Sequence, residues 1–157
     1  MIPYDDIRAV FTESMASALE VRVINLNAGG KIPGGSFMTY SFSGFDDSAG
    51  FPVFYQENDR LIQRETVPFT VSFLSFADNH GVSVTNALRA RDWIKTIGRD
   101  LLQELDVVVA SIGSVENRDV QIDDEWERRM GFDIDFRTTD TTDQPLEWIE
   151  KVNLKRS

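Results

Sequence analysis

The 157-residue sequence contains no cysteine and a single histidine, His80. Without cysteine the chain has no disulfide framework, no thiol nucleophile and no zinc–thiolate site. A lone histidine also excludes a histidine-based metal cluster. As a general base, His80 would need an acid or a nucleophile beside it. Its place in the turn-forming segment 77–81 predicts instead an exposed loop side chain.

Long hydrophobic runs are missing as well. No apolar stretch approaches the roughly 20 residues that cross a bilayer, and the first residues, Met1 to Ile7, lack the basic start and apolar run of a signal peptide. We therefore expect no membrane contact and a cytoplasmic location.

Positive charge is scarce, since 16 basic residues face 26 acidic ones and the formal net charge is −10. Phosphate binding relies on clustered lysine and arginine, so the balance argues against an exposed nucleic-acid-binding surface. It does not argue against a protein that DNA passes without adhering to it. An acidic surface also serves solubility alone.

Familiar catalytic motifs are lacking. There is no Gly-x-Ser-x-Gly nucleophile elbow. The glycine-rich segment 27–36 contains Gly30-Lys31, but Ile32-Pro33 follows where a phosphate-binding loop needs serine or threonine opening a helix. This segment is predicted to be a flexible loop that reaches a neighbouring protein.

The strongest pattern that is present lies near the C-terminal end. Residues 132–137 alternate strictly between apolar and charged side chains, which is typical of a strand with one face buried in a core. The two faces are Phe132, Ile134 and Phe136, and Asp133, Asp135 and Arg137.

The rest of the chain predicts an α+β fold. Its mixed, mostly antiparallel sheet is flanked by an N-terminal helix at 2–20 and one long central helix at 84–105, capped by Ser83 or Thr85. Further strands are expected at 21–25, 37–45, 51–55, 64–76 and 106–112. Residues 138–145 are expected to form a loop, and 144–157 a last strand or an arm. We expect one domain spanning 1–157.

Asp133 and Asp135 are the candidates for catalysis. Two carboxylates on one strand face, with a third from Glu125 or Glu127, match a spacing that metal-dependent nucleases use. This pattern leaves a metal-dependent nuclease or small hydrolase open as an alternative.

Arginines near these carboxylates offer a second explanation. Arg137 shares the strand face, and Arg128 and Arg129 lie just upstream, so charge pairing accounts for the pattern without a metal. Arg89 and Arg91 belong to the predicted central helix, where a solvated face or a subunit contact fits better than a DNA-binding helix.

The segment Val115-Glu116-Asn117-Arg118, followed by Trp126-Glu127-Arg128-Arg129-Met130-Gly131-Phe132-Asp133-Ile134, resembles the neck or tail terminator proteins of tailed bacteriophages. The similarity continues upstream into the helix around Arg89, Asp92 and Trp93 and the strand at 107–112.

The resemblance implies a structural subunit of a ring, typically of six copies, which ends the tail tube and joins it to the head-side connector. DNA would pass through without specific binding. The implied partners are further copies of the chain, the tail tube protein and the connector protein. The implied location is the virion, with the host cytoplasm during assembly. The resemblance offers no cofactor and no catalytic residue, and another head–tail completion protein remains an alternative.

Two groups of residues are candidates for contacts in such an assembly. The first would lie at a subunit interface or in the lumen, and comprises Arg89, Arg91, Arg128, Arg129, Asp133, Asp135 and Arg137. The second would contact partner proteins through the glycine-rich loop, and comprises Gly29, Gly30, Lys31, Gly34 and Gly35.

Overall fold

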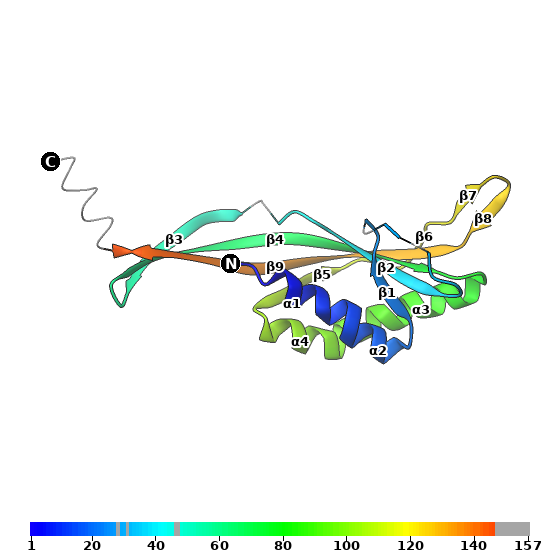
Figure 1. Ribbon diagram of the computed structural model, residues 1–157, viewed down its shortest axis with the longest axis horizontal. Helices are drawn as coiled ribbons and strands as arrows, with labels where there is room; N and C mark the ends of the chain where they lie inside the picture. Colours follow the sequence, from blue (N-terminus) through cyan, green and yellow to red (C-terminus); the bar gives the residue numbers. More distant parts are fainter. Residues whose placement is uncertain (28, 31, 46–47, 147–157) are drawn as a thin grey trace.

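A computed structural model describes residues 1–27, 29–30, 32–45 and 48–146. Among these residues, seven strands form one mixed sheet, and the helices lie together on one of its faces (Figure 1). The predicted α+β fold is confirmed. In the described part of the chain, every helix is too short or too polar to cross a membrane.

Two helical stretches cover the sheet. Asp5 and Asp6 sit in the first turn of the N-terminal stretch, where acidic side chains stabilise the positive end of the helix dipole. Glu20 ends this stretch in a left-handed conformation. The N-terminal stretch consists of α1 (Tyr4–Ala9), the π-helical turn η1 (Val10–Met15) and α2 (Ala16–Leu19); the second consists of α3 (His80–Trp93), the π-helical turn η2 (Ile94–Gly98) and α4 (Arg99–Glu104).

The second helical stretch starts four residues earlier than the sequence predicts. Asn79 caps α3, because its side-chain oxygen accepts hydrogen bonds from the backbone N–H groups of Gly81 and Val82. The predicted caps were therefore wrong, and Ser83 instead donates its buried hydroxyl to the carbonyl of Ser75. His80 is exposed as predicted, but it is the first residue of the helix.

Replacing Asn79 by alanine is expected to lower the free energy of unfolding by about 1 kcal/mol, because two backbone N–H groups lose their acceptor. The exposed Thr85, which the sequence proposed as a cap, is the matched control, and Thr85→Ala should change stability by less than about 0.5 kcal/mol. Urea unfolding of both variants measures the difference. Equal losses would show that Asn79 is not the cap.

The strand order in the large sheet is β1-β2-β4-β9-β5, with β3 also paired to β4 and β6 to β9. The pairing of β1 with β2 is parallel, and the others are antiparallel. A separate hairpin is formed by β7 (Val120–Ile122) and β8 (Glu125–Glu127). The strands of the large sheet are β1 (Arg22–Asn25), β2 (Phe37–Ser43), β3 (Ala49–Glu57), β4 (Arg60–Phe76), β5 (Val107–Ile112), β6 (Glu116–Asn117) and β9 (Arg129–Pro145).

Strands β4 and β9 are both longer than predicted, with 17 residues each. They pair along their whole length, from Arg60 opposite Pro145 to Phe76 opposite Arg129. The predicted loop at 138–145 is therefore wrong, because its threonine-rich sequence continues β9 against the start of β4. The predicted arm lies mostly outside the described residues, since Gln144 and Pro145 end β9 and 147–157 are not described.

Pro68 lies in the middle of β4, at a place where one side of the strand lacks a ladder partner among the described residues. The pairing of β2 reaches Thr70, that of β3 starts at Thr66, and only β9 pairs with the residues between. A missing N–H costs little at such a local edge. Gly44, with a φ of +89°, passes beside the Pro68 carbonyl where the chain leaves β2.

The hydrophobic core lies between the helices and the sheet. Phe11 in η1 is fully buried, and its ring contacts those of Tyr40, Phe73 and Phe136. Phe132, Ile134 and Phe136 of β9 point into this core, as the alternating pattern predicted. We call this side of the sheet the covered face and the other side the open face.

Candidate functional site

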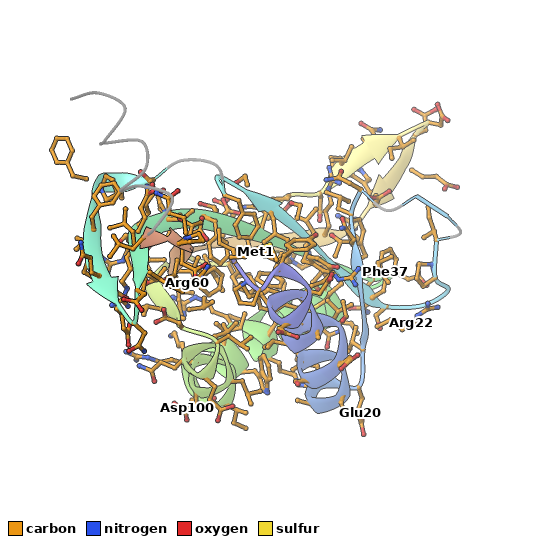
Figure 2. The ribbon with its side chains drawn as sticks, turned by 60° about the vertical axis from the view of Figure 1, so that its left-hand side comes forward. Met1, Glu20, Arg22, Phe37, Arg60 and Asp100 are labelled. Carbon is orange, nitrogen blue, oxygen red and sulfur yellow. The ribbon has the colours of Figure 1, made fainter. Side chains whose placement is uncertain are left out.

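The sheet carries different surfaces at its two ends (Figure 1). At one end the β7–β8 hairpin projects away from the helices. At the other end, β3 and the paired ends of β4 and β9 extend beyond the helices as a three-stranded ribbon. We define the ribbon as β3 with residues 60–66 and 139–145. Figure 2 labels Phe37 near the first end and Arg60 at the second.

A groove of about 1040 Å³ lies between the glycine-rich loop and the β7–β8 hairpin. On its floor, the rings of Phe37 and Phe76 stack with their centroids 4.7 Å apart, and the Arg129 guanidinium lies 6.0 Å from the centre of the Phe76 ring. The groove brings together two groups that the sequence predicted separately. They are Gly29, Gly30, Gly34 and Gly35 from the loop, and Arg128 and Arg129 from the start of β9. Lys31 lies outside the described residues.

Asp119 fixes these arginines in place. Its side chain is only 6% exposed and accepts a 2.7 Å hydrogen bond from the backbone N–H of Arg129 and a 3.0 Å bond from the Arg128 guanidinium. Burial alone would raise the pKa of this carboxyl. The hydrogen bonds from Arg129, Arg128 and Asn117 outweigh burial and lower its pKa below the ordinary value. Asp119 is therefore held as a carboxylate.

Asp133 lies on the open face, where it is neutralised by Arg118. The Asp133 carboxylate accepts hydrogen bonds from the Ser72 hydroxyl at 2.6 Å and from Arg118 at 3.3 Å. Arg118 also binds Glu116 at 2.8 Å. Gly131 makes this contact possible, because a Cβ there would lie 2.7 Å from the Arg118 side chain.

Asp135 is held by hydroxyls rather than by a cation. Its two carboxylate oxygens accept hydrogen bonds from Thr70 at 2.7 Å and Ser111 at 2.8 Å. Within the described residues, no three histidine, aspartate or glutamate side chains gather as metal ligands. The observed partners favour the charge-pairing interpretation of Asp133, with Arg118 as the cation in place of the arginines that the sequence suggested.

The remaining predicted residues are dispersed. Arg137 is exposed on the open face of β9. Arg91 comes from α3, and its guanidinium donates to the carbonyl of Gly113 at 2.8 Å, so it connects the helix to the end of β5. Arg89 is exposed on the same helix. The structure therefore does not bring the two helix arginines together with Asp133 and Asp135.

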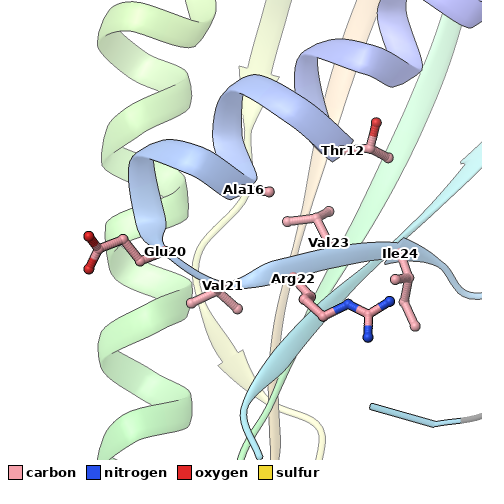
Figure 3. A pocket seen from close by; sticks show the side chains of 7 residues that line it. All are labelled: Thr12, Ala16, Glu20, Val21, Arg22, Val23 and Ile24. Atoms are coloured by element: carbon pink, nitrogen blue, oxygen red, sulfur yellow. The ribbon is translucent and has the colours of Figure 1, made fainter. Parts of the chain in front are cut away.

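A further depression of about 460 Å³ lies between α2 and β1 (Figure 3). Its lining is mostly aliphatic, and the side chains of Glu20 and Arg22 point away from each other. This arrangement offers no convergent polar groups for chemistry. The lining residues are Thr12, Ala16, Glu20, Val21, Arg22, Val23 and Ile24.

The ribbon exposes large apolar side chains. Phe51, Val53 and Phe54 of β3 are 98%, 60% and 58% exposed. The sequence predicted only a short edge piece at 51–55, and β3 runs from Ala49 to Glu57.

Sequence reasoning missed Arg118 and Asp119 as functional residues, although both lie in or beside the quoted Val115-Glu116-Asn117-Arg118 motif. Their partners on and beside β9 lie 9 to 15 residues away in the chain, and the folding back of β6 on β9 brings them together. The signal available was the motif itself, which contains Glu116 and Arg118 and is followed directly by Asp119.

The model of the family described as phage neck terminator protein matches residues 4–156. No curated protein matches the chain. Since the family match spans the sheet, both helical stretches and the groove, this chain belongs to the phage neck terminator protein family.

Proposed function

We propose that this neck protein forms a homo-oligomeric ring, of about six copies, which closes the end of the phage tail tube, joins it to the head-side connector and lets DNA pass. The observation that carries the proposal is the open face of the sheet. Helices cover the other face, whereas the open face carries hydroxyls and carboxylates from β4, β5 and β9.

The composition of this face suits a passage for DNA. Asp133 and Asp135 are fixed by hydrogen bonds within the subunit, so they need no partner from outside. Arg118, the cation beside them, is bound to both Asp133 and Glu116. Fixed carboxylates do not attract the phosphates of DNA, although Arg137 adds an exposed positive charge to this face. The formal charge of −10 has the same effect on the whole subunit.

The groove at the hairpin end is the proposed contact with another neck or tail protein. It combines exposed apolar side chains, among them Trp126 and Ile122, with a glycine-rich rim. Such a mixture of aromatic, aliphatic and arginine side chains is typical of protein interfaces. In this proposal residues 1–157 act as a single domain.

Light scattering after size-exclusion chromatography, over a range of protein concentrations, tests the ring. We expect a mass of several subunits and ring-shaped particles in negative stain, with purified tail tubes added as a template in a parallel sample. A chain that stays monomeric at every concentration and does not bind tail tubes would overturn the proposal.

A nuclease assay tests the alternative enzyme. The ring proposal predicts no divalent-metal-dependent cleavage of DNA by the wild-type protein. Cleavage that requires the metal and disappears in the Asp133→Ala, Asp135→Ala double variant would contradict the structural function.

A further inference from the structure

The ribbon has two long strand edges that lie on opposite sides of the same three strands. On one side, β3 pairs with β4 and its outer edge has no strand partner among the described residues. On the other side, the pairing of β5 with β9 ends at Thr138, so the described chain leaves the outer edge of 139–145 unpaired. Unpaired strand edges present rows of N–H and carbonyl groups that bind further strands.

The second half of the β3 edge lacks the usual protection against such binding. Natural edge strands are protected by charges, by proline, by bulges or by a covering element. Pro52 and the register shift between Ala49 and Val53 protect the first half in this way. Residues 53–56 pair regularly with β4, contain no charged side chain and expose Val53 and Phe54. The helices lie elsewhere along the sheet and do not cover this strand (Figure 1). An exposed apolar edge of this kind is a binding surface.

The β9 edge is polar but electrostatically satisfied. Asp143 binds Arg60 at 2.6 Å, and the hydrogen bond and charge of Arg60 lower the pKa of Asp143. Asp140 lies 3.4 Å from the amino group of Met1. Asp143 keeps its partner when a strand approaches this edge, whereas Asp140 depends on Met1 for its partner. The threonines at 139, 141 and 142 are β-branched residues that favour strands.

One hydrogen bond shows the direction of the backbone groups at this edge. The Met1 amino group donates to the carbonyl of Thr141 at 2.9 Å, although Thr141 is also paired with Arg64 of β4. The Thr141 carbonyl thus points away from β4 and is available to a donor from outside. Met1 is almost fully exposed, so an incoming strand displaces one exposed hydrogen bond and the ion pair between Met1 and Asp140.

We propose that the outer edge of β3 in one subunit pairs with residues 139–145 of β9 in the next copy of this chain. The inference rests on the proposed ring and names its subunit contact. We infer that the partner is a second copy of this chain, because each ribbon carries both edges that the contact needs. One is the apolar outer edge of β3, and the other is the polar outer edge of residues 139–145 on the opposite side. A contact between two different surfaces repeats from subunit to subunit, and it closes into a ring when the rotation allows.

Disulfide trapping tests this pairing directly, because the native chain has no cysteine. Phe54 and Thr142 both pair with Gln63 and so lie on the same face of the ribbon. We expect the Phe54→Cys, Thr142→Cys variant, or the neighbouring register Phe54→Cys, Gln144→Cys, to form a ladder of dimers, trimers and larger species on a non-reducing gel. Each single variant should give no ladder. Dimers from Phe54→Cys alone would indicate β3 pairing with β3 and would overturn the inference.

A second variant tests the energetic role of the edge. Phe51→Lys, Phe54→Lys places two charges on β3, and we expect about a tenfold or larger rise in the concentration needed for assembly. Leu88→Lys, Ile97→Lys is the matched control, since these side chains are 46% and 58% exposed on the second helical stretch and belong neither to the ribbon nor to the groove. At protein concentrations too low for assembly, the thermal unfolding curves of both variants, followed by circular dichroism, should match that of the wild type.

The outcomes separate the two proposals. If the wild type forms rings and the β3 variant forms them equally well, the edge pairing is wrong and the ring function stands. If the wild type forms no oligomer alone or on tail tubes, the ring function itself fails. Loss of assembly in the β3 variant alone, with the control intact, supports both.

Discussion

The free energy of unfolding of the Phe11→Ala variant should be about 3–5 kcal/mol lower than that of the wild type. Phe11 is fully buried, and its ring lies 5.1 Å from that of Phe73, edge to face, with Tyr40 and Phe136 at 6.2 and 6.3 Å. It joins the N-terminal helical stretch to three strands of the sheet. Removing the ring therefore leaves a cavity whose walls belong to different elements and cannot close by a small shift.

The melting temperature of this variant should fall by about 10 °C, given the size of the chain. Phe51→Ala is the matched control, because it removes the same group from a side chain that is 98% exposed. That variant should stay within about 0.5 kcal/mol of the wild type when measured as a monomer. Urea and thermal unfolding give both quantities. A loss below about 1 kcal/mol for Phe11→Ala would mean that the N-terminal helix does not pack as described.

At neutral pH, the free energy of unfolding of the Asp119→Asn variant is expected to be about 1.5–3 kcal/mol lower than that of the wild type. This is the range for hydrogen bonds to a charged group. The change keeps the shape of the side chain but removes the charge that accepts from Arg128 and from the backbone of Arg129. Asp124→Asn is the control. Asp124 is exposed at the tip of the hairpin with a φ of +67°, a conformation that asparagine also adopts readily.

The stabilisation by Asp119 should decrease as the pH falls. Its pKa is lower in the folded chain than the value of about 3.9 expected in the unfolded chain. The carboxylate therefore contributes its full stabilisation above about pH 4, and the contribution disappears as the pH falls through the lower folded pKa. The difference in urea midpoint between wild type and Asp119→Asn should be constant from pH 5 to 7 and shrink at acid pH. A difference that grows at acid pH would contradict the assigned pKa shift.

Much of the fold follows from local sequence patterns. The strict alternation in 132–136 identified the central strand and its buried face, because a period of two residues is unambiguous in a strand. The loop prediction for 138–145 was wrong because threonine, aspartate and proline also favour turns. These residues form a strand because the first part of β4 lies opposite them and pairs with them. Asn79 was read as part of a turn because turns and helix caps use the same residues.

The contacts of the candidate site were harder to predict. The pairing of Asp133 with Arg118 requires that β6 folds back on β9, and no local pattern encodes that return. The sequence named the charged strand face correctly, but it assigned the wrong cations to it. Arg89 and Arg91 share a helix in the sequence, whereas their surroundings depend on which face of the sheet that helix covers.

The position of β9 has a consequence for the synthesis of this chain. β9 is the last strand of the described residues, yet it lies between β4 and β5 in the interior of the sheet. The ribosome makes the chain from the N-terminus at about 5–20 residues per second. β4 and β5 therefore cannot pair with β9 until the end of synthesis. Pairing between distant segments is also slow to form. A prematurely ended chain lacks both the middle of the sheet and one edge of the ribbon. Such fragments cannot complete the sheet of the subunit.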